Sequence, residues 1–298
     1  MTTDLPPQIR ERTVAKARTL LEALPFMQEH AGRVLVLKYG GAAIDSAGLA
    51  ATFAEDLMLL QSVGIKPVVV HGGGPAVTQM SARLGIETTF VDGLRVTDAA
   101  TLDVATMVLA GKLNTDVVAS LVAGGVNAVG LSGVDGRLLL ARKQQVPDLG
   151  FVGEVVHVKA DVLATLLDRS FVPVVASIAI DEHGQAYNVN ADVVAAELAV
   201  ALDAEKLVYL NDVPGLIGPT GDLLSELSVS QAQELLATPG VVDGGMIPKI
   251  ESAVRALQAG IGRVHLVDAR VEHAVVLELF TPEGIGTMIT PDREVPST

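Results

Sequence analysis

Lys38 comes directly after a run of apolar residues and is followed by a pair of glycines, Gly40 and Gly41. The apolar run predicts a buried strand, so Lys38 would project from the carboxyl edge of a sheet, where open α/β sheets bind ligands. Because glycines carry no side chain, the backbone there can approach an anion closely. Taken alone, the segment is more typical of a surface lysine before an ordinary turn.

A second glycine-rich segment, His71-Gly72-Gly73-Gly74-Pro75, lies between a predicted strand and a predicted helix. Pro75 suits the first position of that helix, and the N–H groups at a helix amino terminus bind anions. The segment is neither a Walker A loop nor a G-x-G-x-x-G fingerprint. A tight turn is the alternative, but three consecutive glycines carry a large cost in conformational entropy. We therefore expect an anion at Gly73 and Gly74.

Three polar side chains could bind or orient ligands. Arg95, two residues after Gly93, offers a planar fork that matches a carboxylate, although a surface acid could pair with it instead. Asn188 and Asp192 open a predicted helix in the run Asn-Val-Asn-Ala-Asp, where such residues usually act as caps. Beyond capping, Asn188 could bond a substrate, and Asp192 could sit between lysines and hold them in place.

Lys249 follows Gly245 at the predicted start of another helix. A lysine near the positive end of a helix dipole is mildly unfavourable, which suggests that an anion binds nearby. A turn that begins at Asp212 and ends at Gly215 follows a further predicted strand and could contact a nucleotide. An isolated Pro-Gly turn, however, needs no function.

Together these residues favour phosphoryl transfer. That reaction needs positioning and charge neutralisation more than covalent help, and two lysines, two glycine cradles and an aspartate could supply both. The sequence has no Gly-x-Ser-x-Gly segment, no cysteine, and no metal-ligand spacing among its six histidines. These absences weigh against a hydrolase, an enzyme with a catalytic thiol and a metalloenzyme.

The composition limits the partners. The 298 residues are 49% hydrophobic but only 3% aromatic, and the formal net charge is −14. An acidic surface repels nucleic acid and anionic membranes, so we expect neither as a partner, and a bound anion requires a local cationic pocket. We find no signal peptide and no apolar run of membrane-spanning length, and therefore expect a cytoplasmic protein.

The elements that must position these residues alternate along the chain. Apolar runs rich in β-branched residues predict strands at Val34–Leu37, Val68–Val70, Val126–Leu131, Val172–Ala176, Leu207–Leu210 and Val264–Val267. Helices are predicted at about 47–63, 75–84, 99–123, 160–169, 190–202, 229–237 and 244–260. This order indicates an open, mainly parallel sheet covered on both faces, with hairpins over 137–158.

Residues 8–24 predict an additional amphipathic helix, which Pro25 would stop or kink. The helix either packs on its own domain, as the residues alone favour, or joins subunits. We divide the chain into this helical segment at 1–25, an amino-terminal lobe at 26–202 and a carboxyl-terminal lobe at 203–298.

In order and spacing, the motifs from about residue 26 onward resemble the amino acid kinase superfamily, and within it the N-acetylglutamate kinases of arginine biosynthesis. The resemblance implies an α/β fold, an open αβα sandwich with a mainly parallel central sheet. It also implies ATP-dependent phosphorylation of the side-chain carboxylate of N-acetyl-L-glutamate, giving N-acetyl-L-glutamyl 5-phosphate. The amino-terminal lobe would dimerise and bind the acyl amino acid, and the carboxyl-terminal lobe would bind ATP.

The resemblance assigns a role to each candidate. Lys38 and Lys249 would stabilise charge on the transferring phosphoryl group, and Asp192 would orient both lysines. The acyl amino acid would be bound by Gly73, Gly74, Arg95 and Asn188, with Arg95 on its α-carboxylate. The nucleotide would be bound by Gly40, Gly41, Asp212, Gly215 and Gly245. Mg²⁺ would arrive with ATP, held mostly by phosphate oxygens, so no metal site built by the protein alone is expected.

Arginine-inhibited members of the family are similar to this chain in two further features. One is the extra amino-terminal helix, which interlaces dimers into a homo-hexamer. The other is the segment near the carboxyl terminus that contains Glu278 and Gly284. The resemblance implies that Glu278 pairs with the guanidinium of L-arginine, Gly284 offers backbone contacts, and Lys206 contacts the effector's carboxylate. Regulation by a PII-type protein stays open.

Two alternatives stay open. The chain could be a catalytically silent, arginine-sensing module with the same fold, although the presence of both lysines favours an enzyme. It could also be a related kinase that acts on another amino acid, such as glutamate or aspartate.

Overall fold

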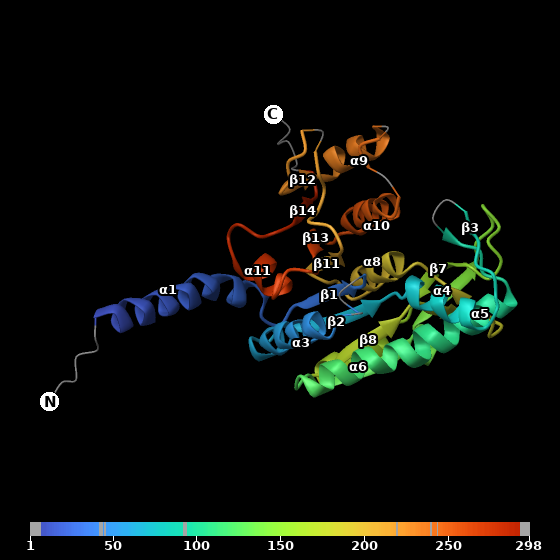
Figure 1. Cartoon of the computed structure of the whole chain (residues 1–298), viewed down its shortest axis with the longest axis horizontal. Coiled ribbons are helices and arrows are strands. Elements are labelled where there is room, and N and C mark those ends of the chain that lie inside the picture. The colour runs from blue at the N-terminus through green and yellow to red at the C-terminus, as the bar shows by residue number, and fades with distance from the viewer. Residues whose placement is uncertain are drawn as a thin grey trace.

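The computed structural model describes residues 7–41, 44, 46–91, 94–218, 220–238, 240–242 and 244–292. Gly93, next to the predicted Arg95 site, and residues 1–6 of the amino-terminal segment lie outside the described residues. A central sheet organises the described part of the chain (Figure 1). In spatial order its strands are β12 (Glu226–Ser228), β14 (Thr287–Thr290), β13 (Arg263–Asp268), β11 (Lys206–Asn211), β1 (Val34–Tyr39), β2 (Lys66–His71), β8 (Val172–Ala176) and β5 (Ala128–Ser132).

Neighbouring strands run parallel except β13 and β14, which confirms the mainly parallel α/β sandwich. β1 pairs with β2 on one side and with β11 on the other, although β11 follows it by more than 160 residues. The strand order therefore reverses at β1, and ligands bind beyond the carboxyl ends of the strands at such a point.

The central strands of the sheet are buried on both faces because they are largely apolar. In β1, Leu35 and Leu37 face one hydrophobic core and Val36 faces the other. The core that contains Val36 is closed by helices α7 (Asp161–Asp168), α8 (Ala191–Ala201), α9 (Val229–Ala237) and α10 (Met246–Gln258). The opposite core is closed by α3 (Ala47–Ser62), α6 (Asn114–Ala123) and α11 (Ala274–Phe280). All six predicted strands and the helices between them are present.

One long helix combines α5 (Ala99–Thr106), a π-helical segment η1 (Met107–Leu113) and α6. Its 25 residues, with a mean hydropathy of 1.2, could cross a membrane by length and composition, so the expectation that no stretch has that character was wrong. It is instead a core helix: 44% of its most apolar window is buried, and it packs on α3, β5 and β8. π-Helical segments are frequent at functional sites.

Smaller elements cover the carboxyl edge of the sheet on the side of β2. A second sheet contains β10 (Ala186–Asn188), β9 (Ile178–Ile180), β6 (Leu139–Lys143) and β7 (Gly153–Val158). Antiparallel pairing of β6 with β7 confirms the hairpin predicted within 137–158. The remaining elements are the hairpin β3 (Phe90–Val91) and β4 (Leu94–Arg95), helix α4 (Gly74–Arg83) and the short turn η2 (Asp135–Arg137).

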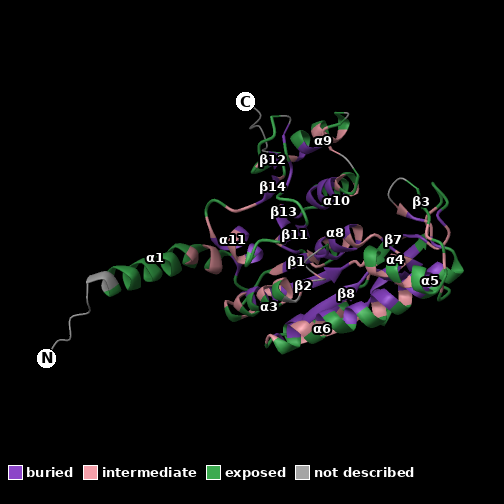
Figure 2. Cartoon of the chain, viewed as in Figure 1, coloured by how far each residue is buried: buried purple, intermediate pink, exposed green. Residues whose placement is uncertain are grey.

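Helix α1 (Pro7–His30) projects from the body of the molecule, and most of it is exposed (Figure 2). Of the two predicted effects of Pro25, a stop or a kink, the stop was wrong: a proline removes one backbone donor, and the helix continues to His30. Only its last turns are anchored, through Ala23, Phe26 and Met27, which pack against the core that contains Leu35.

Candidate active site

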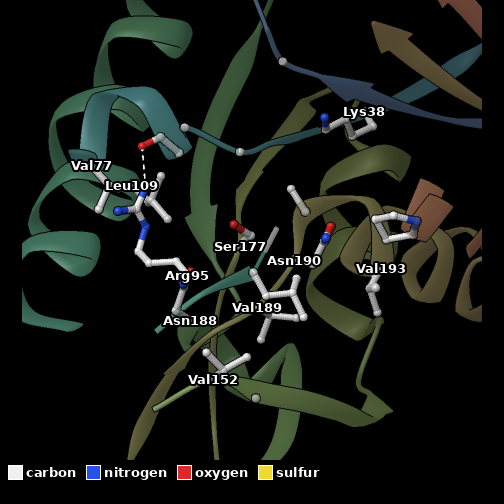
Figure 3. Close-up of a pocket in the computed structure, with 18 of the residues that line it drawn as sticks. Lys38, Val77, Arg95, Leu109, Val152, Ser177, Asn188, Val189, Asn190 and Val193 are labelled. Atoms are coloured by element: carbon white, nitrogen blue, oxygen red, sulfur yellow. Dashed lines mark hydrogen bonds between the residues drawn. The ribbon is translucent and has the colours of Figure 1, made fainter. Parts of the chain in front are cut away.

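A cavity of about 650 Å³ opens at the carboxyl edge of β1 and β2 (Figure 3). Predicted substrate, phosphate and catalytic residues from four separate segments line it, namely Lys38, Gly40, Gly41, Gly73, Gly74, Arg95 and Asn188. Lys249 and Asp192 lie behind its wall, where their chain neighbours Pro248, Ala191 and Val193 form the lining. The structure thus brings together residues that are up to 211 positions apart in the sequence.

Asp192 lies between the two predicted lysines. Its Oδ1 is 3.0 Å from the Nζ atom of Lys38, and its Oδ2 is 2.9 Å from that of Lys249. The Lys249 contact is an aligned hydrogen bond, whereas the Lys38 contact is an ion pair without that alignment. Asp192 is placed at the first turn of α8 by Asn190, whose side chain caps the helix by accepting the Asp192 N–H at 2.7 Å.

Burial and charge oppose each other in this group. Burial alone would raise the pKa of Asp192, but Lys38 and Lys249 outweigh it and hold that pKa below its usual value. The pKa of Lys249 is lowered by burial and by the nearby charge of Lys38, against the opposing effect of Asp192. The result is two closely spaced cations held by one fixed anion at the wall of the cavity, with Asp212 as a further carboxylate near Lys249.

The amino terminus of α4 forms the wall next to these lysines. Gly73 is the N-cap, and Pro75 occupies the first turn as predicted. A Cβ atom on Gly73 would lie 2.4 Å from Leu113 and 2.7 Å from Leu109, so only glycine lets α4 pack this closely on η1. With no side chain at the cap, the first N–H groups of α4 are open to an anion.

His71 fixes the end of β2 beneath this helix. The Asn114 side chain donates to His71 Nε2 at 3.0 Å, which leaves the proton on Nδ1 to be donated to the Gly72 carbonyl at 2.9 Å. Burial lowers the pKa of His71, so the ring is neutral. Asn114 follows the π-helical segment and also donates to the Val174 carbonyl, which ties the long helix to β8.

Arg95 reaches the cavity from the β3–β4 hairpin. Its Nη2 donates to the Gly74 carbonyl and to Thr78 Oγ1, each at 2.8 Å, and its guanidinium lies 4.8 Å from the centre of the Phe90 ring. Its Nη1 is buried and has no hydrogen-bond acceptor, and no carboxylate within the described residues lies at ion-pair distance. Burial lowers the pKa of Arg95, yet a guanidinium stays charged at neutral pH. A buried cation with a spare donor requires an anionic partner.

The predicted nucleotide residues separate into two groups. A Cβ atom on Gly41 would lie 2.0 Å from the Asp212 carboxylate, so these two residues adjoin each other next to Lys38. Gly215 instead packs against Thr287 of β14, and Gly245 is exposed at the start of α10. Neither Gly215 nor Gly245 lines the cavity.

The three residues predicted to bind arginine meet elsewhere, near the junction of α1 with the body. Glu278 accepts hydrogen bonds from His265 Nδ1 at 2.6 Å and from the Ile285 and Gly286 backbone N–H groups at 2.7 and 3.0 Å. A Cβ atom on Gly284 would lie 3.0 Å from Glu278 Oε2, so Gly284 adjoins this carboxylate. Lys206 is buried, and that burial is the main reason why its pKa falls to about 8.

Glu29, His30 and Glu205, beside this cluster, could geometrically hold a metal ion. However, Arg263 already pairs with Glu29, and Arg33 and His30 contact Glu205. The two arginines balance the two carboxylates, so the group is better explained as an ion-pair network that anchors the end of α1.

Several residues that shape the cavity were not identified from the sequence. Thr78 and Phe90 hold the Arg95 guanidinium, and Asn114 holds His71. Each acts through a contact between distant segments, and its residue type is ordinary for its local position. Only the isolated Asn114 within an apolar helix offered a signal that the sequence analysis did not use.

Comparison with known proteins agrees with this geometry. The sequence profile of the amino acid kinase family matches residues 33–268 of this chain. The chain belongs to the amino acid kinase family. Within it, the chain groups with the acetylglutamate kinases. It is 50% identical over 278 residues to the acetylglutamate kinase of Acaryochloris marina (strain MBIC 11017). The alignment covers 92% of this chain and 98% of that relative.

Solved structures show the same fold. N-acetylglutamate synthase from Neisseria gonorrhoeae, complexed with coenzyme A and N-acetyl-glutamate, has a TM-score of 0.83 and 29% identity. The match covers 93% of this chain but 64% of the synthase, so this chain spans about two thirds of that protein's length. The synthase complexed with coenzyme A and L-arginine gives a TM-score of 0.80 at 28% identity, over 93% of this chain and 65% of the synthase.

Proposed function

We propose that the protein transfers the γ-phosphoryl group of ATP to the side-chain carboxylate of N-acetyl-L-glutamate, a step of arginine biosynthesis in the cytoplasm. The product is N-acetyl-L-glutamyl 5-phosphate. One observation carries the proposal: Arg95, which has no ion-pair partner among the described residues, and Lys38 line one cavity, with Lys249 directly behind its wall, so the cavity can hold a dicarboxylate and a phosphate together. The identity with acetylglutamate kinases supports the choice of substrate.

Arg95 would bind the α-carboxylate through its free Nη1, because no other group of the described chain neutralises this cation. Asn188, which donates to Thr97 Oγ1 only at 3.4 Å, would turn its amide to the same substrate. The side-chain carboxylate would then lie at the amino terminus of α4, near Gly73 and Gly74 and within reach of Lys38. The apolar side chains Val77, Leu109 and Leu113 in the same wall suit the acetyl methyl group.

Lys38 and Lys249 would stabilise the charge that spreads over the equatorial phosphoryl oxygens during transfer. Asp192 holds both ammonium groups in place before the reaction, so no reorganisation is needed. When bound with ATP, Mg²⁺ neutralises phosphate charge. Asp192 is paired with both lysines, and Asp212 is the carboxylate beside the Gly41 backbone. This arrangement suits an Mg²⁺ ion that is held mainly by the phosphate oxygens of ATP.

The proposal is tested by incubating the purified protein with ATP, Mg²⁺ and N-acetyl-L-glutamate and trapping the acyl phosphate with hydroxylamine. We expect hydroxamate with N-acetyl-L-glutamate, far less with free L-glutamate, and a loss of about 100- to 1,000-fold in kcat for Lys249→Ala. Preference for the free amino acid would contradict the substrate. No hydroxamate with any acceptor, combined with a thermal shift caused by arginine alone, would support the silent sensor instead.

We also propose that L-arginine inhibits the enzyme at the cluster of Lys206, Glu278 and Gly284. The convergence of these residues and the arginine complex of the Neisseria synthase support the proposal. A guanidinium would compete with His265 for Glu278. Arginine should therefore raise the melting temperature of the wild type, and Glu278→Gln should abolish that rise without lowering basal turnover. An unchanged arginine shift in Glu278→Gln would contradict this site.

A further inference from the structure

We propose that Tyr209 is a positioning residue for phosphoryl transfer, which braces Lys249 and Asp192 through its hydroxyl and through the face of its ring. The inference rests on the proposed kinase function and adds a residue to it. Tyr209 lies in β11, directly beside Lys38 in the neighbouring strand β1. Its side chain is fully buried and extends under the amino ends of α8 and α10, which carry Asp192 and Lys249.

The hydroxyl of Tyr209 touches both helices. It lies 3.2 Å from the Asp192 backbone carbonyl and 2.8 Å from Ser252 Oγ. Ser252 in turn donates to the Lys249 backbone carbonyl at 2.8 Å. Only two hydroxyl protons are available for these three contacts. The shorter distances favour a chain of hydrogen bonds in which Tyr209 donates to Ser252 and Ser252 donates to the Lys249 carbonyl. The Asp192 carbonyl is the second, longer acceptor.

The ring of Tyr209 contributes separately. The Lys249 ammonium lies 5.2 Å from the ring centre, within the range of a cation–π interaction. Because the ring face favours the charged form, it counteracts the burial that lowers the pKa of Lys249. The other charged groups that face Lys249 are Lys38 from β1, Asp192 from α8 and Asp212 after β11.

Packing of the core alone does not require the hydroxyl of Tyr209. A leucine or phenylalanine would fill the same apolar core, yet the chain buries a hydroxyl and orders it against Ser252. Burial raises the pKa of Tyr209, so the hydroxyl stays protonated and can donate. The brace connects β11 with the two helices that hold the lysine–aspartate group.

Three variants separate the contributions: Tyr209→Phe removes the hydroxyl, Ser252→Ala removes its partner, and Tyr209→Leu removes the hydroxyl and the ring. We expect Tyr209→Phe and Ser252→Ala each to lower kcat about tenfold with unchanged KM values for both substrates. Tyr209→Leu should in addition move the alkaline limb of the kcat profile to lower pH. Tyr187→Phe, which removes a tyrosine hydroxyl bonded to Asp181, is the matched control with wild-type kinetics.

A measurement that needs no turnover separates this inference from the proposed function. The Lys249 side chain, assigned by the signal lost in Lys249→Arg, is titrated by NMR in the wild type, Tyr209→Phe and Tyr209→Leu. We expect a lower Lys249 pKa in Tyr209→Leu alone. If Tyr209→Phe and Ser252→Ala keep the wild-type kcat, and Tyr209→Leu keeps the wild-type titration, Tyr209 has only a structural role and the inference is overturned. An inactive wild type with a shifted titration would instead refute the kinase function.

Discussion

At the scale of single residues, the site depends on the balance of charge around Asp192. Two ammonium groups within hydrogen-bonding distance of one carboxylate repel each other, and all three groups are largely buried. Asp192→Asn keeps the shape but removes the negative charge. We expect kcat to fall about 100-fold or more, and the melting temperature to fall as well, because the lysines lose their counter-charge.

Steady-state kinetics and thermal melts check this prediction. Asp168→Asn is the matched control, because it removes a carboxylate from an exposed ion pair with Lys66 and should change neither quantity appreciably. If Asp192→Asn retained the wild-type kcat, the aspartate would not organise the lysines.

For Arg95 we predict a different effect, because its proposed role is to bind the substrate carboxylate. One Nη atom is already held by Thr78 and the Gly74 carbonyl, so the guanidinium has a fixed orientation at the wall of the cavity. A lysine lacks this fork. For Arg95→Lys we expect the KM for N-acetyl-L-glutamate to rise about 10- to 100-fold, with the KM for ATP nearly unchanged.

Initial rates with each substrate varied in turn decide the question, with Arg83→Lys at the exposed end of α4 as the control. Equal effects of Arg95→Lys on both KM values would mean that Arg95 supports the whole cavity instead of one carboxylate.

The sequence identified the charged residues of the site but not the residues that hold them. Lys38, Arg95, Asp192 and Lys249 carry a chemical signal of their own, since each stands next to glycines or at a helix start. Thr78, Ser252 and Tyr209 carry none, because their role exists only through contacts between distant segments. Local patterns report which groups could do chemistry, and tertiary contacts decide how those groups are aimed.

At the scale of elements, α3 and α11 are connected by ionic contacts of His273 with Asp56 and, at a longer distance, with Glu55. His273 lies at the N-cap of α11 and its Nδ1 is 2.7 Å from the buried Asp56 carboxylate of α3. Asp56 also accepts the backbone N–H groups of Val275 and Val276, so it caps α11 from outside the helix. The hydrogen bond to Asp56 is the largest cause of the raised pKa of His273, and Glu55 and Glu272 add to it.

This contact predicts a pH-dependent stability. The pKa of His273 is 6.5 when unfolded and higher in the folded protein, so its contribution is complete below pH 6.5 and is lost as the pH rises through the folded pKa. His273→Gln should therefore lower the melting temperature by about 1–3 °C at pH 6 and by less at pH 9. Thermal melts at both pH values measure this, with the exposed His157 of β7, changed to Gln, as control. A difference that does not vary with pH would exclude the ionic contact.

Sequence patterns were reliable for the sheet and less so for helix ends. Apolar runs such as Val34–Leu37 predict strands because burial on both faces demands apolar residues at every position. The helix does not stop at Pro25, because packing of Phe26 and Met27 on the core stabilises a further turn beyond the proline. The fold class follows from local chemistry, and exact element boundaries depend on what the chain packs against.

At the scale of the whole molecule, an acidic protein concentrates cations at one place. The formal net charge is −14, yet the cavity presents Lys38, Arg95 and the nearby Lys249 to its anionic ligands. From the composition we expect neither nucleic acid nor an anionic membrane as a partner, while these cations suit small anions that enter the cavity. This separation of charge could be anticipated from composition, but its location required the strand order that joins β1 to β11.

The projecting helix α1 provides the prediction for the assembly. Its exposed apolar side chains include Leu20 at 68% and Leu21 at 65% exposure, and nothing in the described chain covers them. We propose that this surface joins dimers into the hexamer, so Leu20→Glu combined with Leu21→Glu should yield a smaller oligomer that retains kcat. Analytical ultracentrifugation measures the change. Thr19→Glu, nearly opposite on the helix, should keep the wild-type mass. If the double variant also kept that mass, α1 would not be the joining element, and its apolar residues would need another partner.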